Sequence, residues 1–277
     1  MSRGENTMND LPRISVIVPS FNQGRFIEKT LRSVIDQGYP NVELMVIDGG
    51  STDETVDVLK KYNDQLTYWV SEKDRGQSHA FNKGLARATG NIVGWLNSDD
   101  VYLNRSLFQA ADYFAAYPEI DIVFSDYIYV DGTGRYLKRR KEPPFSYNIY
   151  LWSGDCYHAN IAGFFRRRVF EKNGGLDESL HYSMDYEFYL RAGKAGMKFG
   201  HVREYWGAYR FHSASKSITA YGRMLADARI LLARYQPSDV GPCGARLRKA
   251  WFRSQRIAQK AMIGSYLPYR PNYPVNA

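Results

Sequence analysis

The sequence predicts a mixed α/β fold organised around a mostly parallel sheet. The almost unbroken apolar run Ile14–Val18 indicates a buried strand, which Pro19 is expected to end. Apolar residues then recur at a helical period over 26–36, after Asn22, a residue that can cap a helix. A second strand, Val42–Ile47, is again followed by helical patterning. Two consecutive strand–loop–helix units imply parallel strands joined by right-handed crossovers.

A third apolar run, Gly90–Leu96, leads directly into Asn97-Ser98-Asp99-Asp100. Because the carboxyl ends of parallel strands meet at one edge of a sheet, the loops at 20–22, 48–52 and 97–100 are expected to converge on one ligand. Adjacent carboxylates repel each other unless they are solvated or share a cation. The pair therefore favours a divalent cation beside a sugar hydroxyl, with a solvated turn or helix N-cap as the alternative.

Later elements extend the same domain. Ile120–Phe124 indicates another strand, with Ser125 and Asp126 at its end, and a helix is expected over 186–194. The basic run Lys138–Lys141 is interpreted as a solvated loop. The predicted division is a flexible N-terminus at 1–12, a catalytic domain at 13–216 and a basic, mainly helical extension at 217–277.

Composition excludes several classes of protein. Hydrophobic residues make up 44% and aromatic residues 15% of the 277 residues, which excludes a disordered chain. Cys156 and Cys243 are the only cysteines, so neither a disulfide framework nor a cysteine metal site is implied, and both thiols are expected to be inert. No apolar run approaches ~18 residues and no signal peptide is apparent. The expected location is the cytoplasm, with peripheral contact at the inner face of the cell membrane.

The net charge is confined to the end of the chain. Residues 221–277 contain ten Lys/Arg and two Asp/Glu, whereas 1–220 contain 27 of each. A helix over 246–263 would be amphipathic, which suits an anionic membrane surface. Docking on the protein body, with solvated basic side chains, or contact in a homo-oligomer is the alternative, and nucleic-acid binding is not expected. At 100° per residue, one arc carries Ile257, Ala250, Ala261, Leu247, Ala258, Trp251 and Met262, and the other carries Arg256, Lys249, Lys260, Arg253 and Arg246.

The order of three motifs resembles that of family 2 glycosyltransferases, which have the GT-A fold. These motifs are Ile14–Asn22, Asp48-Gly-Gly-Ser-Thr-Asp53 and Asn97-Ser-Asp-Asp100. The segment Asp74–Gly84 resembles the donor loop of that family and the helix after it, and Met184–Arg191 resembles the segment that holds its catalytic carboxylate. The resemblance covers roughly residues 13 to 216.

This resemblance implies an inverting, metal-dependent transfer of a sugar from a nucleotide-diphosphate donor. The implied acceptor is a hydroxyl of a glycan or lipid-linked glycan in polysaccharide or cell-envelope biosynthesis. Asp185 is the implied general base, and Asp100 the implied ligand of Mn²⁺ or Mg²⁺. His212 is a second metal or diphosphate contact. The implied donor-binding residues are Pro19, Phe21, Asp48, Asp74, Gln77, Asn82, Asp99 and Lys216.

Two departures from the family pattern are informative. Gly49 stands where many uridine-diphosphate users carry a second acidic residue, so guanosine- and thymidine-linked donors stay open beside the commoner uridine donors. Met184 replaces the acidic residue that often precedes the base. Two other functions also stay open, a nucleotidyltransferase-like enzyme and a non-catalytic nucleotide-sugar-binding module. Retention of Asp48, Asp99, Asp100 and Asp185 together argues against the non-catalytic module.

Overall fold

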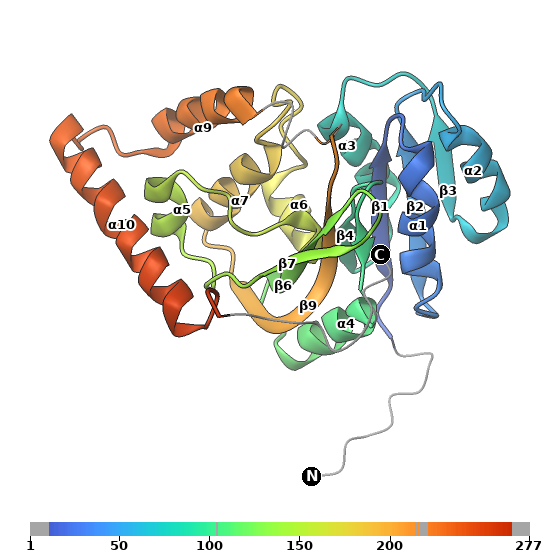
Figure 1. Ribbon diagram of the computed structural model, residues 1–277, viewed down its shortest axis with the longest axis horizontal. Helices are drawn as coiled ribbons and strands as arrows, with labels where there is room; N and C mark the ends of the chain where they lie inside the picture. Colours follow the sequence, from blue (N-terminus) through green and yellow to red (C-terminus); the bar gives the residue numbers. More distant parts are fainter. Residues whose placement is uncertain (1–10, 104, 214, 216–220, 268–277) are drawn as a thin grey trace, which may run out of the picture.

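The computed structural model describes residues 11–103, 105–213, 215 and 221–267 (Figure 1). In these ranges a nine-stranded sheet has the order β3-β2-β1-β4-β8-β6-β9-β5, with β7 paired to β6. The strands are β1 Ile14–Ser20, β2 Val42–Asp48, β3 Tyr68–Ser71, β4 Ile92–Trp95, β5 Val101–Tyr102, β6 Ile122–Asp131, β7 Tyr136–Arg140, β8 Gly163–Arg166 and β9 Phe199–Phe211. The helices are α1 Gly24–Ile35, α2 Thr55–Lys61, η2 Asn63–Gln65, α3 Gln77–Arg87, α4 Ser106–Ala116, α5 Tyr147–Ser153, η3 Asn160–Ala162, α6 Arg167–Asn173, α7 Met184–Lys194, α9 Tyr221–Tyr235 and α10 Pro242–Met262.

The predicted parallel arrangement of the first strands is confirmed. β1 pairs in parallel with β2 and with β4, and β2 pairs in parallel with β3. Strand β8 runs antiparallel to both β4 and β6, so the sheet as a whole is mixed. Ser20 pairs with Asp48 in the β1–β2 register, which brings the ends of these two strands level. The loops that follow them therefore begin at the same edge of the sheet.

Two local expectations at the first strand were wrong. Strand β1 does not stop at Pro19 but continues to Ser20. The β1–β4 ladder ends at Ile17, so the missing N–H of Pro19 costs no hydrogen bond on that side. Asn22 does not cap α1, since Gln23 holds the N-cap position. Asn22 instead has a positive φ of 52°, and its side-chain oxygen accepts a hydrogen bond from the Thr52 amide at 2.9 Å.

Two expectations further along the chain also need correction. Asp126 does not end a strand, because β6 runs on to Asp131. Its buried carboxylate lies 2.9 Å from Nε2 of His201 on β9 and 3.3 Å from the Arg203 guanidinium. The basic run beginning at Lys138 is not a loop either, since residues up to Arg140 belong to β7 and pair with β6. Pairing with a neighbouring strand supplies the backbone hydrogen bonds that local composition cannot reveal.

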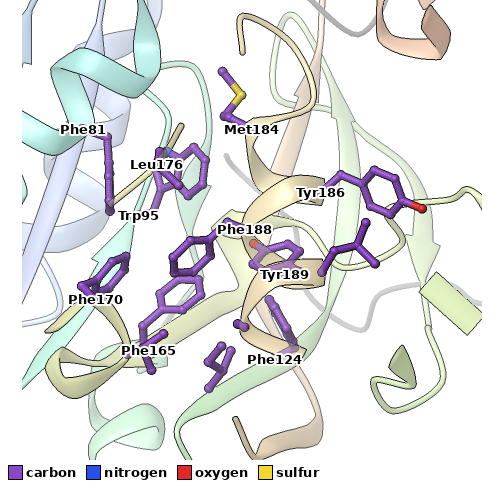
Figure 2. Packing of buried hydrophobic residues seen from close by; sticks show 14 of the residues in the cluster. Phe81, Trp95, Phe124, Phe165, Phe170, Leu176, Met184, Tyr186, Phe188 and Tyr189 are labelled. Carbon is purple, nitrogen blue, oxygen red and sulfur yellow. The ribbon is translucent and has the colours of Figure 1, made fainter. Parts of the chain in front are cut away.

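A cluster of buried aromatic side chains fixes helix α7 against the sheet. Figure 2 shows Phe188 and Tyr189 of α7 directed towards Phe165 and Phe170. The rings of Phe170 and Phe188 stack with centroids 5.2 Å apart. Such packing holds a helix in one register because a shifted register would leave voids. The first turn of α7 is thereby held in a fixed position, and Asp185 is in that turn.

Helix α10 docks on the protein body beside α5 (Figure 1). The docking alternative describes this contact, and its solvated basic side chains are seen at Arg246, Arg248, Lys249 and Arg253 but not at the remaining two basic residues of the helix. Arg256 and Lys260 form ion pairs with the buried carboxylate of Glu142, and their side chains are only 12% exposed. Within the described residues, no helix has the length and apolarity needed to cross a bilayer.

Candidate active site

The loop after β2 is organised by Asp48. One oxygen of this buried carboxylate accepts hydrogen bonds from the Ser51 amide at 2.8 Å and the Ser71 hydroxyl at 2.6 Å. The Gly50 amide donates to this same oxygen at 3.2 Å, and the other oxygen accepts a hydrogen bond from the Ser51 hydroxyl. Asp48 therefore shapes the loop that faces the donor edge, and its oxygens are already engaged by that loop.

Phe21 follows β1 at the same edge and is 58% exposed, whereas Pro19 is buried. A phenylalanine of the core would be buried, so exposure excludes the core interpretation of this ring. An exposed aromatic ring beside a polar loop offers a surface on which a nucleotide base can stack.

Asp74 lies against the glycine that marks the departure from the family pattern. A Cβ atom built on Gly49 would be 2.8 Å from Oδ2 of Asp74, so a side chain at position 49 would require the Asp74 carboxylate to shift. Oδ1 of Asp74 accepts a hydrogen bond from the Gly76 amide at 2.7 Å, which tethers the loop before α3. A carboxylate thus lies in the space that an acidic side chain at position 49 would occupy.

Asn97 is the centre of a polar network. Its side-chain oxygen accepts hydrogen bonds from Gln77 at 2.7 Å and from Asn160 at 3.2 Å, and its amide donates to Asp100 at 3.1 Å. The structure thus brings Gln77 to the strand-end motif as expected. Sequence reasoning missed Asn160, which comes from η3 far along the chain and had no motif to identify it.

Asn82 is not brought to this edge. Its oxygen accepts from the Leu176 amide at 2.8 Å, and its amide donates to the Leu176 carbonyl at 2.9 Å and to Glu178 at 3.0 Å. The Asn82 side chain holds the loop between α6 and α7. Its hydrogen bonds therefore support a structural role and not a direct contact with the donor. Lys216, the remaining expected donor contact, lies outside the described residues.

The two adjacent aspartates have different surroundings. Asp100 is only 1% exposed, and its carboxylate accepts the Arg210 amide at 2.8 Å and the Asn97 amide. Burial, reinforced by the charge of Asp99, raises the pKa of Asp100 well above its usual range. The Asp99 carboxylate instead lies 3.0 Å from Nε2 of His212. His212 is thus paired with Asp99 and not with Asp100, although Asp100 was expected to share the metal with it.

Asp99 and His212 fit a divalent cation better than Asp100 does. A carboxylate and an imidazole suit Mn²⁺, and a nucleotide diphosphate can supply further oxygen ligands. Both oxygens of Asp100 are occupied by hydrogen bonds in a buried site. Among the described residues, no cluster of three or more His, Cys, Asp or Glu side chains forms a complete protein site.

Asp185 lies in the first turn of α7. Its Oδ1 accepts a hydrogen bond from the Tyr186 amide at 2.8 Å. Burial raises the pKa of Asp185, while the Tyr186 amide and the Cys156 thiol, both hydrogen-bonded to it, oppose the rise. A raised pKa brings a carboxylate closer to the range useful for a general base. The contact with Cys156 was not predicted, because the sequence offered no reason to place this thiol near the base.

A cavity of about 240 Å³ opens between the segment before α7 and helix α9. His181 borders it and lies 3.3 Å from where a Cβ atom on Gly76 would stand, so the cavity adjoins the donor loop. The Arg223 guanidinium donates a hydrogen bond to the Tyr182 hydroxyl at 2.9 Å. The lining residues are Ser179, His181, Tyr182, Arg223, Ala226 and Asp227.

Comparison with known proteins agrees with this geometry. Residues 15–176 match the family model Glycosyl transferase family 2. An uncharacterized glycosyltransferase of Mycobacterium tuberculosis is 33% identical over 190 residues, which are 67% of this chain and 70% of the relative. Chondroitin synthase of Escherichia coli is 25% identical over 72% of this chain. The chain spans 29% of that synthase and 54% of an uncharacterized glycosyltransferase from Nostoc.

Solved structures show the same fold. Residues 1–349 of TarS of S. aureus in complex with UDP-GlcNAc have a TM-score of 0.67 at 22% identity, covering 93% of this chain and 76% of that TarS chain. The mannosyltransferase PcManGT from Pyrobaculum calidifontis, in complex with GDP-Man and Mn²⁺, has a TM-score of 0.62 at 20% identity, covering 95% and 78%.

Proposed function

The chain belongs to glycosyltransferase family 2, and on this premise we propose that it moves a sugar from a nucleotide-diphosphate donor to a hydroxyl of a glycan or lipid-linked glycan, with inversion at the anomeric carbon. The observation that carries this proposal is the polar edge where the loops after β1, β2 and β4 meet, with Asp185 in the nearby turn of α7. Carboxylates gathered in this way at one edge of a sheet are typical of functional sites.

The donor in this proposal is a uridine diphosphate sugar. Oδ2 of Asp74 lies where an acidic side chain at position 49 would project, and a carboxylate there can accept the imide N–H of uracil. The complex of TarS with UDP-GlcNAc supports the same class of donor, while that of PcManGT with GDP-Man keeps guanosine as the competing base.

The protein ligands of the divalent cation are Asp99 and His212. Their side chains are partly buried, 21% exposed for Asp99 and 8% for His212, whereas both oxygens of Asp100 accept hydrogen bonds, from the Arg210 backbone amide and the Asn97 side chain. A bound cation supplies positive charge to the diphosphate leaving group. In this arrangement Asp100 connects the loop after β4 to the backbone of Arg210 in β9, so its contribution to cation binding is indirect.

Asp185 accepts the proton in the transfer step. As the acceptor oxygen forms its bond to the anomeric carbon, the bond from that carbon to the diphosphate oxygen breaks, and the acceptor proton passes to the Asp185 carboxylate. Attack opposite the leaving group inverts the anomeric centre. The Tyr186 amide at 2.8 Å orients the carboxylate for this task.

The acceptor approaches through the cavity before α7. Tyr182 offers an aromatic ring, the kind of surface on which the apolar face of a sugar packs, and Arg223 adds hydrogen-bond donors. The cavity adjoins the loop before α3 through His181, and its Tyr182 comes two residues before α7, the helix that carries Asp185. This position beside both segments supports the cavity as the path of the acceptor.

The test is transfer from a panel of nucleotide sugars, combined with calorimetric titration of the donor. Asp185→Asn is expected to bind donor as the wild type does and to lose turnover by roughly 10²–10⁴-fold, the range for a positioned general base. Asp57→Asn is the matched control, because that aspartate is 79% exposed on α2. If donor affinity falls in step with turnover, Asp185 binds the donor, and a product of retained configuration would exclude direct displacement.

A further inference from the structure

The outer face of α10 exposes an unusual amount of apolar surface. The exposed fractions are 73% for Leu247, 61% for Trp251, 59% for Ile257 and 78% for Met262. At 100° per residue these side chains share one half of the helix, together with several alanines. Figure 1 shows α10 as the outermost layer beside α5, with its outer side uncovered. Contiguous exposed apolar patches on a soluble domain usually mark an interaction site.

The orientation of α10 is opposite to that of an ordinary surface helix. A surface helix normally buries its apolar stripe and exposes its charged face. Here Arg256 and Lys260 face the body and bind Glu142, while Trp251 faces outwards. Among the described apolar side chains of α10, Phe252 and Ala245 pack on the main core cluster, both partly buried. The protein body therefore leaves the apolar half available to another partner.

The charges around this face select the chemistry of that partner. The chain has no Asp or Glu between 241 and 263. Arg246 borders the apolar half on one side and Arg248 on the other, and both residues are exposed. In a two-fold dimer through this face, the same cationic border would meet itself and repel. Anionic lipid headgroups complement the border, and acyl chains complement the apolar residues.

We propose that the outer face of α10 binds an anionic membrane surface, with the helix lying parallel to the bilayer. The helix is about 30 Å long at 1.5 Å per residue, so Leu247, Trp251 and Met262 can enter the interface together. Docking through Glu142 on the opposite side fixes the rest of the domain to this helix. The binding itself is independent of the transferase reaction.

The test is sedimentation of the full chain with vesicles of phosphatidylcholine alone and of phosphatidylcholine with phosphatidylglycerol. We expect binding to the anionic vesicles at low salt, weakened by added salt, and quenching of Trp251 fluorescence by brominated acyl chains. Trp251→Ser should weaken partitioning into the anionic vesicles by about tenfold, and the double variant Leu247→Ser/Trp251→Ser should weaken it by more. Each variant removes an apolar side chain that would be buried in the membrane interface. Arg246→Gln/Arg248→Gln should reduce the preference for anionic lipid.

Tyr117→Ser is the matched control, because Tyr117 is an exposed aromatic residue at the end of α4, 47% exposed and not on α10. The melting temperatures of all variants should stay near that of the wild type, since the altered side chains are exposed. Absence of binding to anionic vesicles at low salt would overturn the proposal. Binding that Trp251→Ser leaves unchanged would also overturn it, as would a dimer that Trp251→Ser dissociates in the absence of vesicle binding.

Discussion

Glu142→Gln should release helix α10 from the body without unfolding the catalytic domain. Glu142 is 1% exposed, and Oε1 lies 2.6 Å from Nε of Arg140 and 2.8 Å from Nζ of Lys260. Oε2 lies 3.1 Å from the Arg256 guanidinium. One buried carboxylate thus contacts three cations, and two of the three belong to α10. The amide of glutamine has similar volume but removes the negative charge.

The expected size of the effect follows from burial. Removing one partner of a buried ion pair costs about 3–5 kcal/mol, and we take the lower value because glutamine retains one acceptor oxygen. The apolar contribution from partly buried Phe252 is about 1 kcal/mol, roughly half that of a fully buried side chain. Arg256 keeps its ion pair with Asp155 at 2.7 Å in this variant, so the release is a more frequent opening of α10: about 3 kcal/mol corresponds to an opening that is about 10²-fold more frequent.

Hydrogen–deuterium exchange followed by mass spectrometry measures this opening directly. Peptides from α10 should exchange about 10²-fold faster in Glu142→Gln, while peptides from β1 and β2 keep their protection. Glu171→Gln is the control, because the ion pair of Glu171 with Arg167 is on the surface and 61% of the Glu171 side chain is exposed. Unchanged protection of α10, or equal loss of protection in β1, would refute the role assigned to Glu142.

Three further outcomes are expected. Asp74→Asn keeps an oxygen for the Gly76 amide but turns an N–H donor towards the base. The Kd for UDP should therefore rise by about 10-fold or more, while the Kd for GDP should change little. Equal loss of affinity for both nucleotides in calorimetry would argue against base recognition. Because burial raises the pKa of Asp185 and only the carboxylate accepts a proton, kcat should fall as the pH drops through this raised pKa, and Asp185→Asn should lack that acid limb in its pH profile. The raised pKa of Asp100 means that the folded state binds its proton more tightly than the unfolded state, so stability falls as pH rises from the unfolded pKa through the folded one. In metal-free buffer the melting temperature of Asp100→Asn relative to wild type should therefore increase with pH, and a gap that does not vary with pH would contradict this.

Periodicity predicted the first part of the fold because the signals are local. Apolar runs such as Ile14–Val18 and Val42–Ile47 are strands in the structure, and their parallel pairing follows from the helices between them. The expectations that failed depend on neighbours distant in sequence. β6 continues past Asp126 because His201 and Arg203 on β9 stabilise its carboxylate, and no local pattern reveals a partner on another strand.

The candidate site was predicted in part for the same reason. Motif order identified Asp99, Asp100 and His212, but it could not assign the two aspartates to their partners. That assignment depends on the Arg210 amide, whose position is set by β9. Asn160 was missed because a single asparagine in a short helical turn has no spacing signal. Polar networks are built from tertiary contacts, so sequence patterns reveal their members only when a motif names them.

Gly49 lacks the carboxylate that the family pattern places at this position, but a neighbouring residue supplies a carboxylate to the same space. Sequence comparison with the family pattern leaves position 49 without a carboxylate and so weakens the expectation of a uridine donor. In the structure, Oδ2 of Asp74 lies 2.8 Å from the Cβ that Gly49 lacks, so the donor loop supplies a carboxylate to the same space. A side chain at position 49 would therefore require the Asp74 carboxylate to move. On the proposal that Asp74 recognises the base, Gly49→Ala should disturb base selectivity by displacing Asp74 even though alanine adds no charge.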